Sequence, residues 1–387
     1  MTEKPMRVVI INRSFWPVYP VIGEALLRFA EGVANHGHSV SVVMQDHAGI
    51  KGKLAEADRG EGVSFYPAKA FTTSASGVLH RACDAVFFMF WVLAVLLWVR
   101  PSRVYVSTDP PVVVPFFVMF YCWLFSAEYI YHLQDIHPEA ANVVMPVNKW
   151  VYKILFKMDT MSIRKAKRLI TITEQMATEI RLRSGTTIPI HVLDNPAISF
   201  DNIDTTKPKI AGFSFCGNAG RLQRMPLMLK TIETYFERGG RLEFTFAGGG
   251  VYSDRLKALA DKFPHFHYLG LVSPTEAAQI SANYTWALLP IEDDVTRFAF
   301  PSKSSSYVFS GADILAVCGE QTGVAQWLKE NQVGLVVKPE VETVVAIFFD
   351  IEKGYYQEKS NETSREALKK KIRFEVFIEA LDRIVLA

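Results

Sequence analysis

The run RVVIIN at residues 7–12, with its apolar β-branched centre, most constrains how this chain can fold. Such a run is typical of a strand that is buried on both faces of a parallel sheet. Residues 24–36 follow with helical periodicity and stop before Gly37, and residues 40–44 form a second apolar run. The order strand, helix, strand is that of a βαβ unit, so we predict an α/β fold.

The same organisation continues along the chain and then starts again. Apolar runs predict further strands at residues 104–107, 129–133, 169–173 and 190–193, and a second series at 212–216, 242–247, 267–269, 286–289, 314–317 and 334–337. Helices are predicted between the later strands, at 226–238, 253–263, 275–283, 301–310 and 323–331. The sequence therefore predicts two doubly wound, Rossmann-like domains that bind ligands at facing carboxyl edges of their sheets, across a cleft.

The 387 residues suffice for two such domains. We predict an N-terminal domain over residues 1–197, a polar linker over 198–208, and a C-terminal domain over 209–365. A helical pattern over 366–387 ends the chain, and its return to the N-terminal domain is left open.

Charge and cysteine content narrow the class of protein. Forty-two basic residues oppose 40 acidic ones, and this balance argues against a strongly basic nucleic-acid binder. The four cysteines stand singly, without metal-ligand or disulfide spacing, so we expect reduced thiols in a cytosolic compartment. The apolar run near the N-terminus is too short for a signal peptide, and we do not expect export.

Two long apolar stretches, at residues 85–99 and 112–125, are shorter than the roughly 20 residues that a membrane span needs. They are interpreted either as buried core helices or as helices that dip into one leaflet. The basic segment 147–168 favours the second interpretation, because lysines flank an apolar side in the pattern of a membrane-surface helix. A solvated charged face over a core stripe is the alternative. The predicted membrane contacts are Trp91, Leu97, Phe117, Phe120, Lys149, Trp150, Lys153 and Lys157.

Four glycine-containing or basic segments that follow predicted strands are candidate phosphate sites. Gly23 precedes the first helix, and CGNAGRLQR at 216–224 supplies small residues and two guanidinium groups, which suit a diphosphate. The triplet Gly248–Gly250 permits another close approach, and Pro301-Ser302-Lys303 begins a helix. Tight turns and a capped helix start are the structural alternatives. The GxGxxG fingerprint and the phosphate-loop lysine motif are both absent, which disfavours a nicotinamide cofactor and simple ATP hydrolysis.

The segment HLQDIHPEAA at 132–141 concentrates ionisable side chains after a predicted strand. Asp135, His137 and Glu139 could orient sugar hydroxyls or accept a proton. A loop with a helix-capping aspartate is the alternative. The histidines and cysteines form no metal-ligand set in the sequence.

Taken together, these motifs resemble those of GT-B glycosyltransferases of the retaining family 4, and most of all the branch that builds bacterial O-antigens and exopolysaccharides on lipid carriers. The resemblance rests on motifs that span nearly the whole chain, among them FWP (15–17), STDPP (107–111), DIHPE (135–139), CGNAGRLQ (216–223), AGGG (247–250), FPSK (300–303) and GVAQWLKENQVGLVV (323–337).

The resemblance implies sugar transfer with retention from a nucleotide-diphosphate donor, UDP first and GDP next, without a metal or other cofactor. It implies a polyprenyl-diphosphate-linked acceptor at the cytoplasmic face of the inner membrane. A positive cluster would stabilise the departing nucleotide diphosphate. The implied donor-binding residues are Gly23, Gly217, Asn218, Arg221, Arg224, Gly249, Ser302, Lys303 and Ser306. The implied catalytic residues, facing the acceptor, are Asp135, His137 and Glu139.

One position departs from the family pattern. Family members commonly carry a glutamate three residues after the lysine of FPSK, where it binds the nucleotide ribose, but this chain has Ser306 there. The serine indicates an atypical nucleotide or weakened activity, and it supports one alternative, a non-catalytic partner subunit that keeps the fold. A nucleotide-sugar 2-epimerase on the same architecture is the other alternative.

Overall fold

The computed structural model describes residues 5–19, 21–47, 49–71, 78–197, 200, 203–356 and 362–387. The chain forms two compact units. The first contains Met1–Pro196 and Phe374–Ala387, and the second contains Ala197–Arg373. Residues 198, 199, 201 and 202 of the predicted linker lie outside the described residues.

The first unit is built on a seven-stranded sheet of order β3-β2-β1-β4-β5-β6-β7, in which every pairing is parallel. Its first half contains β1 (Arg7–Ile11), α1 (Ile22–Asn35), β2 (Ser39–Asp46), α2 (Ile50–Glu56), β3 (Val63–Lys69), α3 (Val78–Val99), β4 (Arg103–Ser107) and α4 (Val113–Phe125). It continues through β5 (Glu128–Leu133), α5 (Glu139–Val144), α6 (Lys149–Lys165), β6 (Arg168–Thr171), α7 (Glu174–Ser184) and β7 (Ile190–Val192), and is completed by α16 (Phe374–Leu386).

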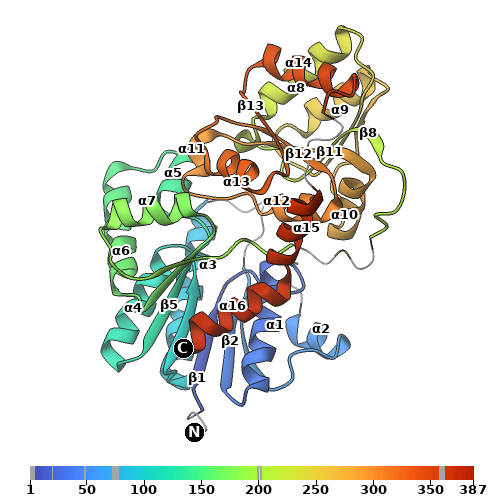
Figure 1. The fold of residues 1–387 in the computed structure, drawn as a ribbon. Helices are drawn as coiled ribbons and strands as arrows, with labels where there is room; N and C mark the ends of the chain where they lie inside the picture. Colours follow the sequence, from blue (N-terminus) through green and yellow to red (C-terminus); the bar gives the residue numbers. More distant parts are fainter. Residues whose placement is uncertain are drawn as a thin grey trace. The chain divides into compact units, whose positions relative to one another are not determined.

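Alternate residues of β1 point to opposite faces of this sheet, as the strand period requires. Val8 and Ile10 belong to a core cluster with α1 and α16, which lie side by side although they are at opposite ends of the chain (Figure 1). Helices α3 and α4 pack on strands of the same sheet and on each other, and α6 packs on α4. Because both faces of the sheet are covered, its central strands can be apolar throughout.

The second unit repeats the architecture with a six-stranded parallel sheet of order β10-β9-β8-β11-β12-β13. Its elements are β8 (Ile210–Cys216), η1 (Arg221–Gln223), α8 (Met225–Glu237), β9 (Glu243–Ala247), α9 (Ser253–Lys262), β10 (Phe266–Tyr268), α10 (Pro274–Asn283) and β11 (Tyr284–Pro290). They continue with α11 (Asp293–Thr296), α12 (Lys303–Ser310), β12 (Asp313–Val317), α13 (Gly323–Asn331), β13 (Gly334–Val337), α14 (Val341–Glu352) and α15 (Glu362–Lys371).

The prediction of two doubly wound α/β halves is confirmed, and each strand order reverses once. The reversal lies between β1 and β4 in the first sheet and between β8 and β11 in the second. The sequence analysis missed β3, an edge strand that contains Pro67 and lacks an apolar run.

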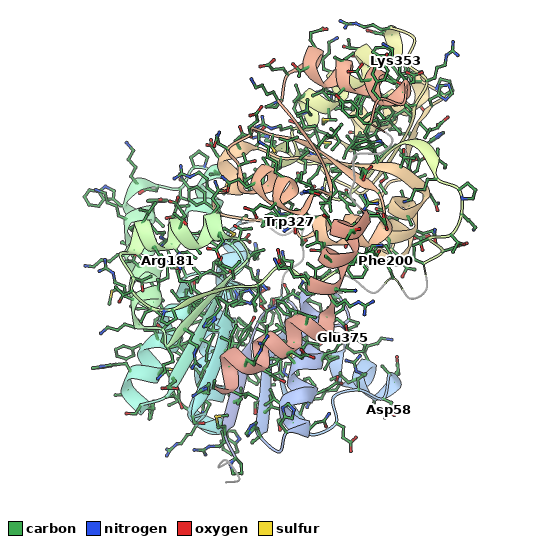
Figure 2. All side chains as sticks on the ribbon, viewed as in Figure 1. Asp58, Arg181, Phe200, Trp327, Lys353 and Glu375 are labelled. Carbon is green, nitrogen blue, oxygen red and sulfur yellow. The ribbon has the colours of Figure 1, made fainter. Side chains whose placement is uncertain are left out.

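The connections of the chain show two further features. Described residues of the predicted linker contact the second unit: Phe200, labelled in Figure 2, stacks on Phe309, and the Asp204 N–H donates to Gln279. The C-terminal pattern is two helices, because it is interrupted at residues 372–373 between the strongly polar α15 and the amphipathic α16.

Candidate functional site

The reversal in the second sheet places the end of β8 beside the start of α12. Lys303, the first residue of α12, extends over the ring of Phe215, with Nζ 4.0 Å from the ring centroid. Its Nζ is also 3.0 Å from the point where a Cβ atom on Gly217 would lie. A methyl group at position 217 would therefore push the ammonium group aside by a few tenths of an ångström, so Gly217 allows the close approach of Lys303.

The Nζ atom of Lys303 is buried and has no hydrogen-bond partner among the described residues, although the residue as a whole is half-buried. Burial lowers the pKa of Lys303 to about 8. A cation at the first position of a helix also faces the positive end of the helix dipole. An anion beside Nζ would relieve both penalties, because it would pair with the ammonium group and accept from free N–H groups of the helix.

Glycines join the loops that follow β8 and β9. A Cβ atom on Gly248 would overlap the carbonyl oxygen of Gly217, and one on Gly250 would overlap that of Ala219. The Ala219 N–H donates to the Gly249 carbonyl at 2.9 Å. We expected this glycine triplet to admit a ligand, but two of its members instead let the two loops pack backbone against backbone.

The two arginines of this region differ. Arg221, on η1, is exposed and has no ion pair or hydrogen bond through its side chain among the described residues. Each of the three nitrogens of Arg224 has an acceptor: Nε donates to the Ile291 carbonyl at 2.7 Å, and the terminal nitrogens pair with Glu292 at 2.9 Å and Asp293 at 2.8 Å. These contacts give Arg224 a structural role in this loop, and its contact with a donor diphosphate stays a prediction.

The remaining predicted donor residues in the second unit surround Lys303 or follow it on the helix. Asn218 is exposed in the loop after β8, and Ser302 is the exposed N-cap residue of α12. Ser306 is half-buried within the same helix. The hydroxyl of Tyr307, which the sequence analysis did not single out, accepts from the Cys216 N–H at 3.3 Å and holds the end of β8 against α12.

Gly23 does not present a free N–H group to a ligand. Its N–H donates to the Tyr19 carbonyl at 3.0 Å. A Cβ atom at this position would lie 2.4 Å from the Trp16 nitrogen. The glycine is required for α1 to pack against its own preceding loop, which corrects the expected contact with the donor.

At the reversal of the first sheet, Arg13 and Asp109 form an ion pair at 3.1 Å. Asp109 also accepts from the Ser14 N–H at 2.8 Å. Asp135 lies in the neighbouring loop, where the Thr108 hydroxyl accepts from its N–H at 3.3 Å. Burial, and then the charge of Asp109, raises the pKa of Asp135 to about 6. This carboxyl group is ionised at neutral pH and is therefore able to accept a hydrogen bond or a proton.

Glu139 belongs to a buried network rather than to an open site. It pairs with Arg183 at 2.9 Å, and Arg183 also pairs with Asp159 at 2.7 Å. Asp159 accepts from the Tyr131 hydroxyl at 2.7 Å. The predicted catalytic role of Glu139 is corrected for this reason, because its carboxylate is committed to a nearly inaccessible guanidinium group.

His137 adjoins both features. Its carbonyl accepts from Arg183 at 3.1 Å, which holds the loop between β5 and α5 on the buried network. Burial, with a further contribution from Arg183, lowers the pKa of His137 to about 4. The imidazole is therefore neutral at physiological pH and acts as a hydrogen-bonding group.

The apolar helices are neither wholly buried nor wholly exposed. Helix α3 buries Phe88, Val92 and Leu96 but exposes Phe90, Leu97 and Trp98, and Trp98 is 82% exposed. Helices α4 and α6 add exposed apolar side chains, namely Phe120, Trp123, Leu124, Phe125, Trp150, Val151 and Ile154. The interpretation of these stretches as purely core helices is wrong, because a helix on a sheet buries only one side.

The predicted membrane contacts fall into two groups. Leu97, Phe120, Lys149, Trp150, Lys153 and Lys157 are exposed. Trp91 is half-buried, with its indole N–H donating to the Tyr66 carbonyl at 3.1 Å, so it fixes α3 to the edge strand β3. Phe117 is half-buried beside Phe116. Within the described part of the chain, no helix is both long and apolar enough to cross a bilayer.

Sequence reasoning missed Arg13, Asp109 and Arg183. Arg13 lies two residues after the end of the first strand. A charged residue at the carboxyl edge of a parallel sheet can be recognised in a sequence as a candidate ligand contact. Arg183 gives no such signal, because its partners are 24 and 44 residues away along the chain.

The described residues contain no cluster of three or more His, Cys, Asp or Glu side chains able to hold a metal ion.

Two Rossmann-like units, each with charged side chains at the reversal of its sheet, define a protein of the GT-B class. Solved structures of this class match nearly the whole chain. HepE from Anabaena, crystallised with UDP, has a TM-score of 0.66 at 11% identity and covers 98% of this chain and 100% of its own. WaaG, a glycosyltransferase involved in lipopolysaccharide biosynthesis, has a TM-score of 0.61 at 13% identity, with coverages of 98% and 99%.

The sequence comparisons agree with the fold. Residues 22–196 match the family model described as a glycosyl transferase 4-like domain. Probable glycosyltransferase WbjE from Pseudomonas aeruginosa is 23% identical over 291 residues, which are 70% of this chain and 72% of WbjE. The chain is a glycosyltransferase with the GT-B fold, and residues 22–196 of its first unit are similar to the 4-like domain.

Proposed function

We propose that this glycosyltransferase transfers a sugar, with retention, from a nucleotide-diphosphate donor to a lipid-diphosphate-linked glycan during the assembly of a surface polysaccharide. The observation that carries the donor assignment is the buried, unpartnered ammonium group of Lys303 at the start of α12. A diphosphate supplies the missing negative charge. Arg221, exposed and unpaired among the described residues, is the second cation for it.

Uridine is the proposed base of the donor, with guanosine next. HepE has been crystallised with UDP and with UDP-glucose, which supports UDP as the first nucleotide to test. As the glycosidic bond breaks, negative charge develops on the leaving diphosphate. Lys303 and Arg221 would stabilise that charge, and no metal or cofactor is proposed.

The acceptor is assigned to the first unit. Asp135, ionised at neutral pH, and neutral His137 would orient an acceptor hydroxyl. The exposed apolar side chains of α3, α4 and α6, together with Lys149, Lys153 and Lys157, support a peripheral contact with the cytoplasmic face of the inner membrane. WaaG and its role in lipopolysaccharide biosynthesis support the same cellular context.

A nucleotide panel tests the donor site. Thermal unfolding is measured with UDP, GDP, CDP and TDP for the wild type and for Lys303→Met, Arg221→Ala and the exposed control Lys257→Met. A ligand that binds only the folded state raises its stability with the logarithm of its concentration. We expect one nucleotide to stabilise the wild type and the control but neither site variant. Equal shifts in Lys303→Met and the control would refute the assignment.

Transfer itself is tested with a polyprenyl-diphosphate-linked sugar and the nucleotide sugar that the panel selects. The configuration of the product's anomeric carbon, read by NMR, distinguishes retention from inversion. Interconversion of the free nucleotide sugar without transfer would favour the epimerase alternative. Nucleotide binding without either reaction would favour the non-catalytic alternative.

A further inference from the structure

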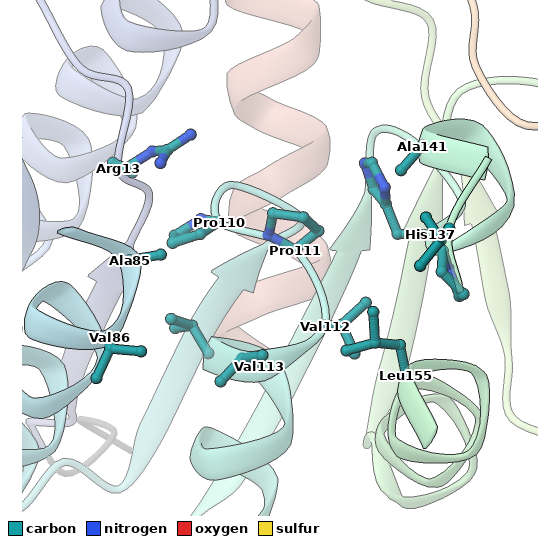
Figure 3. Close-up of a pocket in the computed structure, with 13 residues that line it drawn as sticks. Arg13, Ala85, Val86, Pro110, Pro111, Val112, Val113, His137, Ala141 and Leu155 are labelled. Atoms are coloured by element: carbon teal, nitrogen blue, oxygen red, sulfur yellow. The ribbon is translucent and has the colours of Figure 1, made fainter. Parts of the chain in front are cut away.

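The first unit contains a cavity of about 330 Å³, close to the lower limit of ligand pockets in general. The described residues that line it include members of α3, of the loop that follows β1, of the loop from β4 into α4, of the segment from β5 into α5, and of α6 (Figure 3). Its walls are apolar side chains, with Val86, Pro111, Val112, Ala141 and Leu155 among them. Such walls suit a hydrocarbon chain.

Only two lining residues have ionisable side chains, Arg13 and His137. Figure 3 shows them at two sides of the cavity, with Pro110 and Pro111 between them. His137 is uncharged at neutral pH, because burial lowers its pKa to about 4. Arg13 is therefore the cationic residue among the described lining residues. Asp109 pairs with its Nε atom at 3.1 Å, so its terminal nitrogens are the groups that can contact the anionic head of a ligand with an apolar chain.

Arg13 can receive that head. It uses Nε for the ion pair with Asp109, and no hydrogen bond or ion pair engages its two terminal nitrogens among the described residues. Its side chain is 33% exposed. A guanidinium group whose two terminal nitrogens are free can donate to two oxygens of one phosphate group.

The cavity is continuous with the exposed apolar side chains described above. Val86 lines it and is itself 47% exposed, and the exposed Phe87 and Phe90 follow on the same helix. On the α6 side, Leu155 lines the cavity. The same helix exposes two apolar side chains, Val151 and Ile154, and two lysines, Lys153 and Lys157. A chain that enters the cavity can thus remain on apolar surface as it leaves.

We infer that this cavity holds the phosphate-proximal end of an isoprenoid chain, with the diphosphate on Arg13 and the attached sugar toward Asp135 and His137. The inference rests on the proposed function for its choice of an isoprenoid diphosphate. It adds a binding site for the lipid chain. Recognition of the acceptor then extends from the surface of α3, α4 and α6 to the cavity beside the ends of β1 and β4.

Binding of farnesyl diphosphate, farnesol and inorganic diphosphate is measured by calorimetry on the full chain, without any sugar donor. Ala141→Phe fills the cavity from α5, and Val86→Trp fills it from a position that is already half exposed, so at least one variant should fold. Ala94→Phe on the exposed side of α3 is the matched control. Arg13→Gln removes the charge.

We expect farnesyl diphosphate to bind the wild type and the control more tightly than either fragment does. We expect roughly tenfold or greater weakening in both cavity variants. Arg13→Gln should weaken farnesyl diphosphate but leave farnesol unchanged. Unchanged affinity in folded Ala141→Phe and Val86→Trp, or farnesyl diphosphate no tighter than inorganic diphosphate, overturns the inference. Equal competition by phosphatidylglycerol micelles also overturns it, because the cavity would then be an acyl-chain site.

These results are separable from the fate of the proposed function. Isoprenoid binding in a protein that binds no nucleotide would uphold the cavity assignment and remove the transferase proposal. Sugar transfer to a polyprenyl-diphosphate-linked acceptor, at a rate that Ala141→Phe and Val86→Trp leave unchanged and without measurable isoprenoid binding in this cavity, would uphold the proposed function and remove the cavity assignment.

Discussion

The ammonium group of Lys303 lies 3.0 Å from the point at which Gly217 would carry a Cβ atom, so these two residues share one space. The ammonium group is buried over the Phe215 ring and has no hydrogen-bond or ion-pair partner among the described residues. Because charged groups in protein interiors are normally paired, this arrangement indicates that the missing partner is a ligand.

Replacing Gly217 with alanine should shift the ammonium group of Lys303 and weaken nucleotide binding. The backbone φ of +154° adds strain, and we expect a loss of about 1–3 kcal/mol in stability. Gly239→Ala is the matched control, since its φ is +87° but nothing lies within 4 Å of the added methyl group. The measurement is the nucleotide affinity of both variants, determined by titration. Wild-type affinity in Gly217→Ala would contradict the shared-space argument.

Lys303→Met should stabilise the free protein while it removes nucleotide binding. Burial lowers the pKa of Lys303 from 10.5 to about 8, so between these values the unfolded chain holds the additional proton and stability rises with pH. The free-energy cost of burying the charged Lys303 side chain is fully present below about pH 8. There we expect Lys303→Met to gain on the order of 1–3 kcal/mol. Urea unfolding at pH 7 and pH 10 tests this, and an equal gain at both pH values would count against it.

Nucleotide affinity should fall as the pH rises above about 8, since the free protein then loses the proton on Lys303 that the diphosphate requires. Calorimetry between pH 7 and 10 should also detect proton uptake on binding. Arg221→Ala should bind more weakly at every pH but keep the same dependence, because it leaves Lys303 in place. A wild-type affinity that is independent of pH would exclude Lys303 as the titrating group.

Arg183→Met should be strongly destabilising. It leaves Asp159 and Glu139 buried without their shared cation, and removing one partner of a buried ion pair typically costs about 3–5 kcal/mol. Arg181→Met, on the exposed side of the same helix (Figure 2), should change stability little. Chemical denaturation of both variants is the measurement. Similar unfolding midpoints for the two would show that the network contributes little.

Neutralising Lys149, Lys153 and Lys157 with glutamine should weaken binding to anionic vesicles. Each lysine near an anionic surface contributes about 1 kcal/mol, so the triple variant should lose roughly two orders of magnitude in affinity at low salt. Glutamine at the exposed Lys257, Lys329 and Lys338 of the second unit is the charge-matched control. Co-sedimentation with phosphatidylglycerol vesicles reports the difference. If both triple variants bind equally, α6 is not the contact.

The predicted strands and helices were largely right, because each depends on a short-range pattern. Residues 7–12 read as a buried strand, and β1 is a central strand with parallel neighbours on both sides. The sequence analysis missed β3 for the same reason: an edge strand with one exposed side and a proline lacks that pattern.

The residue types of the candidate site were also visible in the sequence, but their roles were not. Lys303, Arg221 and Asp135 were selected as residues after strands or at helix starts. Arg224 was selected by the same rule, and three acceptors far along the chain hold its guanidinium group. Proximity in sequence identifies which side chains reach a sheet edge and does not identify which of them are already paired.

The sequence by itself determined the two parallel sheets, the loops at their carboxyl edges and the basic and apolar character of α6, since periodicity and composition are local properties. Only the tertiary structure decided which charges remain free. Arg183 neutralises Glu139 across 44 residues, whereas nothing described neutralises Lys303. Burial and pairing depend on groups that the chain brings together only after it has folded, and they set the energy of a charge and therefore what it can bind.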